Sequence, residues 1–313
     1  MSKGVVFAET FIETYPISQF LVLLFTMFLV ITSVYTKTSD YDKEQLAPII
    51  LVHGVSSSQI MGRYHTHGHP KGCEEKSEGK DGWEHFWFNL DMAAWGKHVI
   101  KCWAYRFKLL YDRNTHKCRN QNGVETRVKG KLGSLKCCEY LTQSPASKAL
   151  SISKYFHQLA DRLRHKGYST DLSLKAHCYD WRYAPPQLDE QGYYKSLTEL
   201  VEKVAADTHR KVALVAHSMG GLTTAYFLLN KTQDWKDKYI HAFVTGGTPW
   251  LGSVWSLGGY IVGQTKLTNA QYKVYILLDV LDALCAFVMA SQGAAPPGPP
   301  ITRYASDIRH FSQ

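Results

Sequence analysis

Two apolar patterns divide this chain. The first is one uncharged stretch from Thr14 to Thr36, most of it FLVLLFTMFLVITSVY, in which no polar face recurs at helical spacing. The second covers about residues 145–250, where short apolar runs alternate with segments whose apolar residues recur every three or four positions. The first pattern is typical of a segment that enters a membrane, and the second of strands that alternate with helices.

The alternating part predicts a parallel sheet with crossover helices on both faces, an α/β fold. Strands are expected at 48–54 (PIILVHG), 171–181, 211–217 (KVALVAH) and 239–249, and helices at 147–168, 193–210, 221–231 and 272–290. Residues 55–145 read as loop-rich, and the segment around Pro185 and Pro186 reads as a polar loop.

The apolar leader predicts entry into the secretory pathway. A cleaved signal peptide, with Ser33 near the cleavage site, and an uncleaved anchor both remain open, because Glu9 and Glu13 make a poor basic n-region. We therefore expect a leader at 1–36 and a spacer at 37–47. Seven cysteines without C-x-x-C pairs favour disulfides over zinc, in keeping with that compartment.

Composition and charge limit the classes of partner that we expect. The chain is 45% hydrophobic and 20% charged, as an ordered globular protein is. Its charge of +9 and pI near 9.0 come without a Lys/Arg block of five or more, so we expect no nucleic acid. The alternating His65, His67 and His69 have the residue type of a zinc site but lie in a Gly/Pro-containing segment, so we expect a loop and no metal or organic cofactor.

Residues 212–221, VALVAHSMGG, carry the clearest chemistry. A strand followed by a serine between small residues (Ala216 and Gly220) and then a helix predicts a nucleophile elbow, with Ser218 as the nucleophile. The alternative is a serine that caps a helix after an ordinary strand. In an elbow, the oxyanion is bound by two backbone N–H groups, for which Met219 and Val55 are the candidates.

The general base is harder to find. Of the two histidines after Ser218, His241 opens a predicted strand and so lies away from the carboxyl edge of the sheet. His310, with Asp307 one helical turn before it, is a weak acid/base candidate. Asp180 and Arg182 precede the elbow and are interpreted as a structural pair, because in this fold the acid and the base follow the serine.

The segments PIILVHG, FNLDM, YDWRYAP and VAHSMGGLTTAYFLLNKTQDWKDKYIHAFVTGGTPWLGS together resemble the lecithin:cholesterol acyltransferase family, which includes lysosomal phospholipase and phospholipid:diacylglycerol acyltransferases. The resemblance implies an α/β-hydrolase fold over 48–313, with a small membrane-binding insertion at 55–145 and a cap with a lid at 251–300. It also places the family's catalytic Asp and His beyond the lid, so we expect both residues and the last strands to be missing from this chain.

Residue roles follow from the same resemblance. Ser218 matches the family nucleophile, Met219 and Val55 occupy the oxyanion positions, and Trp250 would pack beside substrate. Cys73 and Cys102 match a disulfide that closes the membrane-binding loop. Between these cysteines lies an aromatic cluster that would enter a lipid surface, with core packing as the alternative: Trp83, Phe86, Trp87 and Phe88.

The expected function is acyl transfer from a glycerophospholipid through an acyl-Ser218 intermediate to a lipid alcohol or water. The expected partners are a phospholipid membrane or lipoprotein surface and a lipid acyl acceptor. The protein would be secreted, lysosomal or membrane-anchored, with Asn230 in a glycosylation sequon. Two alternatives are a catalytically inactive, truncated lipid-binding homologue and a generic carboxylesterase or lipase.

Overall fold

The computed structural model describes residues 46–65, 71–73, 80–87, 97–142 and 153–253. The leader and the predicted lid beyond residue 253 lie outside this part. The chain divides into two compact units, Met1–Leu46 and Ala47–Gln313, and the second holds the elements described below. None of the helices in the described ranges is long and apolar enough to cross a membrane.

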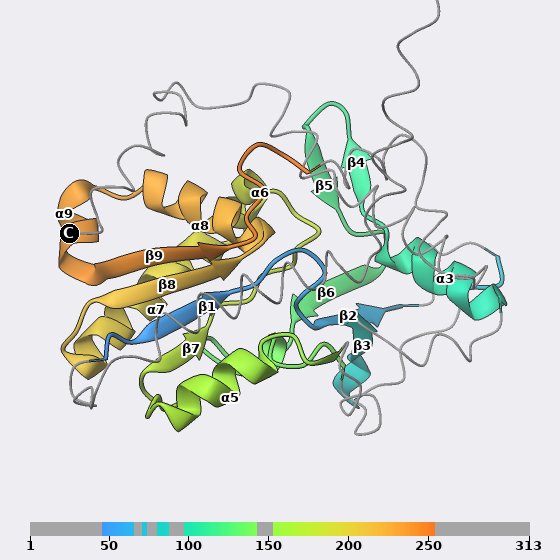
Figure 1. Cartoon of the computed structure of the whole chain (residues 1–313). Helices are drawn as coiled ribbons and strands as arrows, with labels where there is room; N and C mark the ends of the chain where they lie inside the picture. The colour runs from blue at the N-terminus through green and yellow to red at the C-terminus, as the bar shows by residue number, and fades with distance from the viewer. Residues whose placement is uncertain (1–45, 66–70, 74–79, 88–96, 143–152, 254–313) are drawn as a thin grey trace, which may run out of the picture. The chain divides into compact units, whose positions relative to one another are not determined.

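A four-stranded parallel sheet is the centre of the second unit (Figure 1). Its order is β7-β1-β8-β9, and all three neighbouring pairs are parallel. The strands span Ile49–Val52 (β1), Leu174–Ala176 (β7), Val212–His217 (β8) and Ile240–Gly246 (β9). Their positions confirm the four predicted strands, although the one at 171–181 is much shorter than expected. The parallel arrangement confirms an α/β fold.

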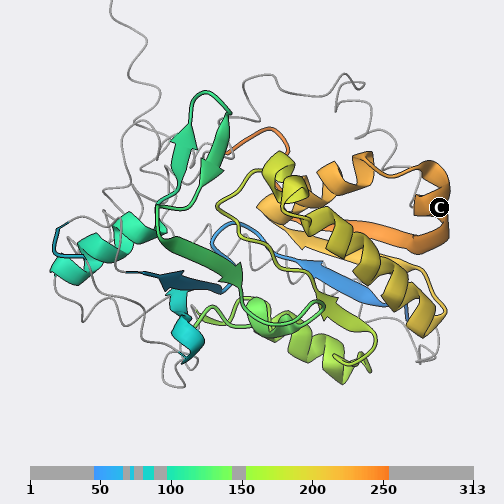
Figure 2. The ribbon, with the colours of Figure 1, turned by 180° about the vertical axis from the view of Figure 1, so that it is seen from behind.

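The two faces of β1 belong to two different cores. Ile50 and Val52 are fully buried in the larger core, which includes side chains of α7 (Tyr193–Thr208) and Phe227 of α8 (Met219–Leu229). Leu51, between them, is buried against Phe156 and α5 (His157–His165). Alternate residues of a strand point to opposite faces, so helices cover both sides of the sheet. Figure 2, seen from behind, shows α7 in front of the strands.

The helices that connect the strands agree only in part with the apolar periodicity. Of the helix predicted at 147–168, the described residues hold the shorter α5, and the helix predicted at 272–290 lies outside the described residues. The predicted helices at 193–210 and 221–231 correspond to α7 and α8, and α9 (Gln233–Tyr239) follows them. The segment predicted as a polar loop is instead α6 (Pro185–Glu190), with its two prolines at the first helical positions. Proline fits there because the N–H it lacks has no partner inside the helix.

Residues 55–142 contain more structure than the loop-rich segment that we predict. A three-stranded antiparallel sheet has the order β3-β2-β6, a hairpin joins β4 and β5, and Figure 1 shows both beside the end of the parallel sheet to which β8 and β9 point. The elements are β2 (Ile60–Tyr64), η2 (Lys80–Gly82), β3 (Glu84–Trp87), α3 (Lys97–Phe107), β4 (Leu110–Asp112), β5 (Lys117–Arg119), β6 (Val124–Val128) and η4 (Leu135–Cys137). Short strands separated by turns give little periodic signal, so sequence reading does not find them.

Arg182 fastens this insertion to the segment that follows β7. Its guanidinium is fully buried and donates to both carboxylate oxygens of Asp180, at 2.9 and 2.6 Å. It also donates to the carbonyl of Phe107 at the end of α3 (2.7 Å) and to the hydroxyl of Thr126 in β6 (2.8 Å). The predicted structural pair is therefore confirmed, and its bonds link three parts of the chain.

We expect Arg182→Met to lower the free energy of unfolding by at least about 3 kcal/mol, because it leaves the buried Asp180 carboxylate without its cation. Denaturant unfolding would measure the change. The control is Lys203→Met, which breaks an exposed pair with Asp207 and should cost less than about 0.5 kcal/mol. Equal losses in the two variants would contradict this role of Arg182.

Candidate active site

Ser218 lies on a sharp turn between β8 and α8. Its backbone has φ 54° and ψ −129°, a conformation that a residue with a side chain adopts at a cost of roughly 1–3 kcal/mol. The Ser218 N–H donates to the carbonyl of Gly246 at the end of β9 (2.8 Å), and the Ser218 carbonyl accepts from the N–H of Gly221 (3.0 Å). The turn is therefore held at the carboxyl edge of the sheet, as a nucleophile elbow requires.

Two glycines make room for this turn. A methyl group at Gly220 would lie 2.4 Å from the carbonyl oxygen of His53, and one at Gly54 would lie 2.7 Å from Cβ of Ser218. Real Cβ atoms do not come this close to other atoms, so neither position accepts a side chain without a shift of the backbone. The loop after β1 therefore runs directly against the elbow.

The two candidate oxyanion donors flank this contact. Met219 is the first residue of α8, and the backbone N–H groups at the start of a helix have no partner within it. Val55 follows Gly54 in the loop after β1, and both side chains are partly buried against the larger core. Their role as oxyanion donors stays a prediction.

His53 supports the loop after β1 from inside. Its ring is fully buried and stacks on that of Tyr179 with centroids 4.2 Å apart. Nδ1 pairs with the carbonyl of Gly54 (2.7 Å), and Nε2 accepts the Tyr179 N–H (3.1 Å). Burial lowers the pKa of His53 to about 4. With both ring nitrogens bonded to the backbone, His53 is not placed to act as the base for Ser218.

The Tyr155 side chain makes contacts at the elbow that sequence reasoning misses. The hydroxyl of Tyr155, just before α5, accepts the Gly54 N–H (3.0 Å) and also pairs with Nδ1 of His217. Burial raises the pKa of Tyr155 to about 12 and lowers that of His217. A lone tyrosine inside a predicted helix carries no signal for such a role, because the contact spans 101 residues of sequence.

Among the described residues, no histidine that follows Ser218 lies beside it. His241 is the second residue of β9, whose first residue pairs with Val212, so it lies at the opposite end of the sheet from Ser218 as predicted. Asp307 and His310 lie outside the described residues. Their assignment stays a prediction.

The aromatic cluster proposed for membrane docking needs correction. Phe86 and Trp87 are 1% and 5% exposed and pack with Trp103 and Phe107, so core packing is the right alternative for these two. Trp83 is partly buried, with the guanidinium groups of two arginines over its ring, and Phe88 lies outside the described residues. Helical or strand spacing cannot separate a membrane-facing aromatic from a core one, because both are apolar.

The other predicted site residues lie near the surface. Trp250 is 41% exposed and meets the ring of Phe243 edge-on, in the loop that follows β9. Thr248 in the same loop packs against the first turn of α8, where a methyl group at Gly221 would lie 2.0 Å from the threonine hydroxyl oxygen. Asn230 is exposed at the C-terminal end of α8, and its side chain donates to the carbonyl of Tyr226 (2.9 Å).

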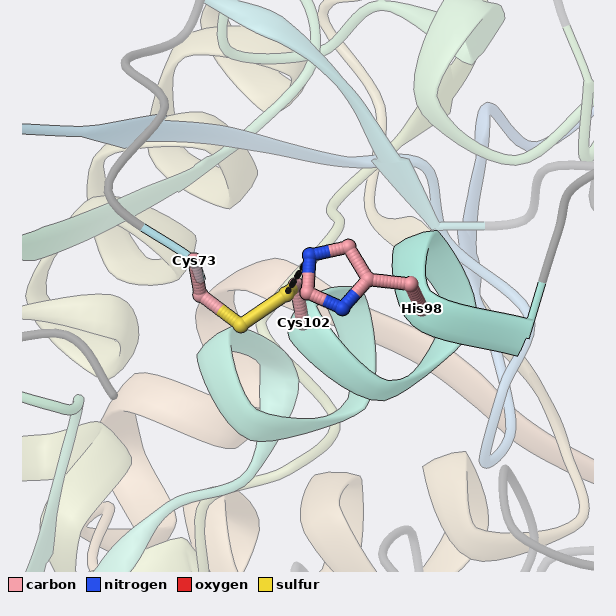
Figure 3. Close-up of side chains that lie close together, drawn as sticks. All are labelled: Cys73, His98 and Cys102. Atoms are coloured by element: carbon pink, nitrogen blue, oxygen red, sulfur yellow. Dashed lines mark hydrogen bonds between the residues drawn. A yellow bond between two sulfur atoms is a disulfide. The ribbon is translucent and has the colours of Figure 1, made fainter. Parts of the chain in front are cut away.

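Cys73 and Cys102 form a disulfide, as the family resemblance implies (Figure 3). His98 lies in α3, as Cys102 does, and its Nε2 is 3.7 Å from the Cys102 sulfur. These three residues are close enough together to suggest a metal site. The two sulfurs are bonded to each other, however, and cannot bind a metal as thiolates in this form.

The same holds for a second cysteine group. Cys137 and Cys178 are joined by a disulfide, with the buried Cys138 beside them. This disulfide ties η4 to the segment after β7. Of the histidines considered for zinc, His65 pairs with Glu125 (3.5 Å), while His67 and His69 lie outside the described residues.

Comparison with known proteins gives consistent matches. The sequence model of the family described as lecithin:cholesterol acyltransferase matches residues 83–280. The chain is 35% identical to the phosphatidylcholine-sterol acyltransferase of Gallus gallus over 182 residues, 58% of this chain and 41% of that protein. It is also 35% identical to the human lysosomal phospholipase A and acyltransferase over 208 residues, 66% of this chain and 47% of that protein. The match to human phosphatidylcholine-sterol acyltransferase is 34% over 208 residues, 66% of this chain and 44% of that protein. The chain thus spans somewhat less than half the length of these relatives.

We expect Gly220→Ala to destabilise the fold by about 1–3 kcal/mol, because the new methyl group would overlap backbone oxygens of the loop after β1. The measurement is the midpoint of denaturant unfolding. Gly246→Ala is the matched control, since a methyl group there meets nothing within 4 Å and should change stability by less than about 0.5 kcal/mol. Equal tolerance of the two substitutions would contradict the close approach of loop and elbow.

We also expect acid to destabilise the protein through its buried histidines. The pKa of His53 is lowered to about 4, below the value of about 6.5 for unfolded histidine. Between these values the unfolded chain binds more protons, so stability that is present above pH 6.5 is lost as pH falls towards 4. The loss from His53 is about 3 kcal/mol.

This pH dependence can be assigned to His53 by comparing unfolding free energies at several values between pH 7 and 4.5 for the wild type and His53→Gln. The variant should show a shallower slope, by up to one proton. Burial also lowers the pKa of His177, to about 3, so part of the slope should persist in the variant. Equal slopes of unfolding free energy against pH in the two proteins would contradict the assignment to His53.

Two charged neighbours also act on His53. Asp180 raises its pKa and His217 lowers it.

Proposed function

We propose, because this chain belongs to the lecithin:cholesterol acyltransferase family, that it is a serine-dependent O-acyltransferase or phospholipase acting on glycerophospholipids. The observation that carries the proposal is the strained turn at Ser218, at the carboxyl edge of the parallel sheet and in contact with the loop after β1. Relatives whose names describe phosphatidylcholine-sterol acyltransferase and phospholipase A activities support the choice of a phospholipid as acyl donor.

In the proposed reaction, the Ser218 hydroxyl oxygen attacks the ester carbonyl of a phospholipid while a general base takes its proton. The Val55 and Met219 N–H groups would bind the oxyanion of the tetrahedral intermediate. The lysophospholipid then leaves with the proton from the general base. A lipid alcohol or water attacks the acyl-serine ester and gives its proton to the base; the Ser218 oxygen–acyl bond breaks, and the base returns the proton to Ser218. Two backbone donors are a fitting arrangement, since removal of one oxyanion donor typically costs about 10²–10³ in kcat.

We further propose that the protein works in the secretory pathway, at a phospholipid membrane or lipoprotein surface. The two disulfides fit an oxidising compartment. One of the matched relatives is named as a lysosomal protein, and the lowered pKa of His53 would keep this residue neutral in a mildly acidic lumen. Glycosylation at the exposed Asn230 belongs to the same proposal.

The test is acyl release and transfer by the full chain on phosphatidylcholine vesicles that carry a labelled acyl group, with and without an added lipid alcohol. Ser218→Ala should lower turnover by at least about 10³-fold, because it removes the nucleophile. Ser169→Ala, a hydroxyl in the loop before β7, is the control and should keep wild-type turnover.

Other outcomes would select the alternatives. Hydrolysis of soluble short-chain esters without action on vesicles would identify a generic carboxylesterase. Vesicle binding without Ser218-dependent turnover of either substrate would identify a non-catalytic lipid-binding homologue and contradict the proposal.

A further inference from the structure

The backbone around Gly54 needs outside support if it is to hold an oxyanion donor. It lies against the nucleophile, where a methyl group would come within 2.7 Å of the Ser218 Cβ, so the position admits only glycine. Glycine, however, restricts its own φ and ψ less than any other residue. The direction of the next N–H, that of Val55, therefore depends on what binds the peptides on either side of Gly54.

Both of those peptides have side-chain partners. The peptide between His53 and Gly54 carries the Gly54 N–H, which donates to the Tyr155 hydroxyl (3.0 Å). The peptide between Gly54 and Val55 carries the Gly54 carbonyl, which pairs with Nδ1 of His53 (2.7 Å). Fixing two consecutive peptide planes fixes φ and ψ at the glycine between them, and with them the direction of the Val55 N–H.

Tyr155 differs from His53 because it also reaches the elbow. Its hydroxyl pairs with Nδ1 of His217, the residue immediately before the nucleophile. The Tyr155 hydroxyl oxygen thus contacts both the loop after β1 and the residue before the elbow. The ring of Tyr155 is held in place by Phe156, with centroids 4.4 Å apart, and contacts His217 edge-on at 5.4 Å.

We propose that Tyr155 is a positioning residue that sets the distance between the oxyanion loop and Ser218 by bridging Gly54 and His217. The inference rests on the proposed function, since it assigns Tyr155 a role in that same reaction. Its hydroxyl would not touch substrate. It would act through the Val55 N–H, so its loss should weaken a contact that forms in the transition state and leave substrate binding unchanged.

The chain offers a matched control at the start of β1, the end opposite to Gly54. The hydroxyl of Tyr168 donates to the carbonyl of Ala47, two residues before β1 (3.1 Å). Tyr168→Phe and Tyr155→Phe therefore each remove one hydroxyl bonded to backbone next to β1. They differ in that the Tyr155 hydroxyl lies beside the elbow and also pairs with His217. Phenylalanine keeps the ring, so both variants should fold.

The first measurement is kcat and KM of both variants on phosphatidylcholine vesicles, using the full chain. We expect Tyr155→Phe to lower kcat by roughly 10-fold or more with KM unchanged, since a misplaced oxyanion donor loses much of its effect. Tyr168→Phe should stay within about two-fold of the wild type. A similar kcat for Tyr155→Phe and Tyr168→Phe would overturn the proposal.

The second measurement does not depend on turnover. Amide hydrogen exchange over residues 53–57, followed by mass spectrometry, should be faster in Tyr155→Phe than in the wild type and unchanged in Tyr168→Phe. Unchanged exchange in Tyr155→Phe would overturn the bridge even if the enzyme proved inactive. A wild type without Ser218-dependent turnover would contradict the proposed function, while exchange would still decide whether Tyr155 holds the loop.

Discussion

The structure depends on one close contact, between the loop that follows β1 and the turn that follows β8. At this contact a methyl group added to Gly54 or Gly220 would overlap atoms of the opposite segment. No side chain could be inserted without moving the strands apart, and the parallel pairing of β1 with β8 holds them together. The strained backbone of Ser218 is stable because its surroundings on both sides are fixed. The strained backbone at the nucleophile therefore depends on the close packing of the two glycines.

The rest of the second unit can be understood as support for that contact. Helices cover both faces of β1, so its position is set by two cores at once. The Arg182 network and the Cys137–Cys178 disulfide fasten the insertion and η4 to the segment after β7, next to the loop that carries Gly54. His53 and Tyr155 then act at the level of single peptides. Support thus runs from whole elements down to individual hydrogen bonds.

The aromatic residues show how a family resemblance and a fold can disagree about individual side chains. Phe86 and Trp87 belong to the stretch that the resemblance assigns to membrane contact, yet they are buried with Trp103, Phe107 and Trp181. Phe86 and Trp87 are consecutive in β3, and the pairing with β2 shifts register there, from Ile60 with Trp87 to Met61 with His85. Such a bulge breaks the strict alternation of faces, so both aromatic side chains join the same core. For these two side chains, burial inside the insertion supplies the apolar surroundings that a lipid surface would otherwise provide.

The parallel α/β core, the elbow and the position of Ser218 can be predicted from the amino-acid sequence, because they depend on local patterns: apolar period, strand length and small residues at fixed spacing. The sequence also indicated that Asp180 and Arg182 are a structural pair, since in this fold the acid and the base follow the serine and these two residues precede it. Three other features follow from long-range contacts that the sequence pattern does not reveal: the antiparallel sheet at 55–142, the burial of Phe86 and the bridge from Tyr155 to Gly54. Each of these joins residues far apart in the chain, and no local pattern records which distant segment a side chain will meet once the chain has folded.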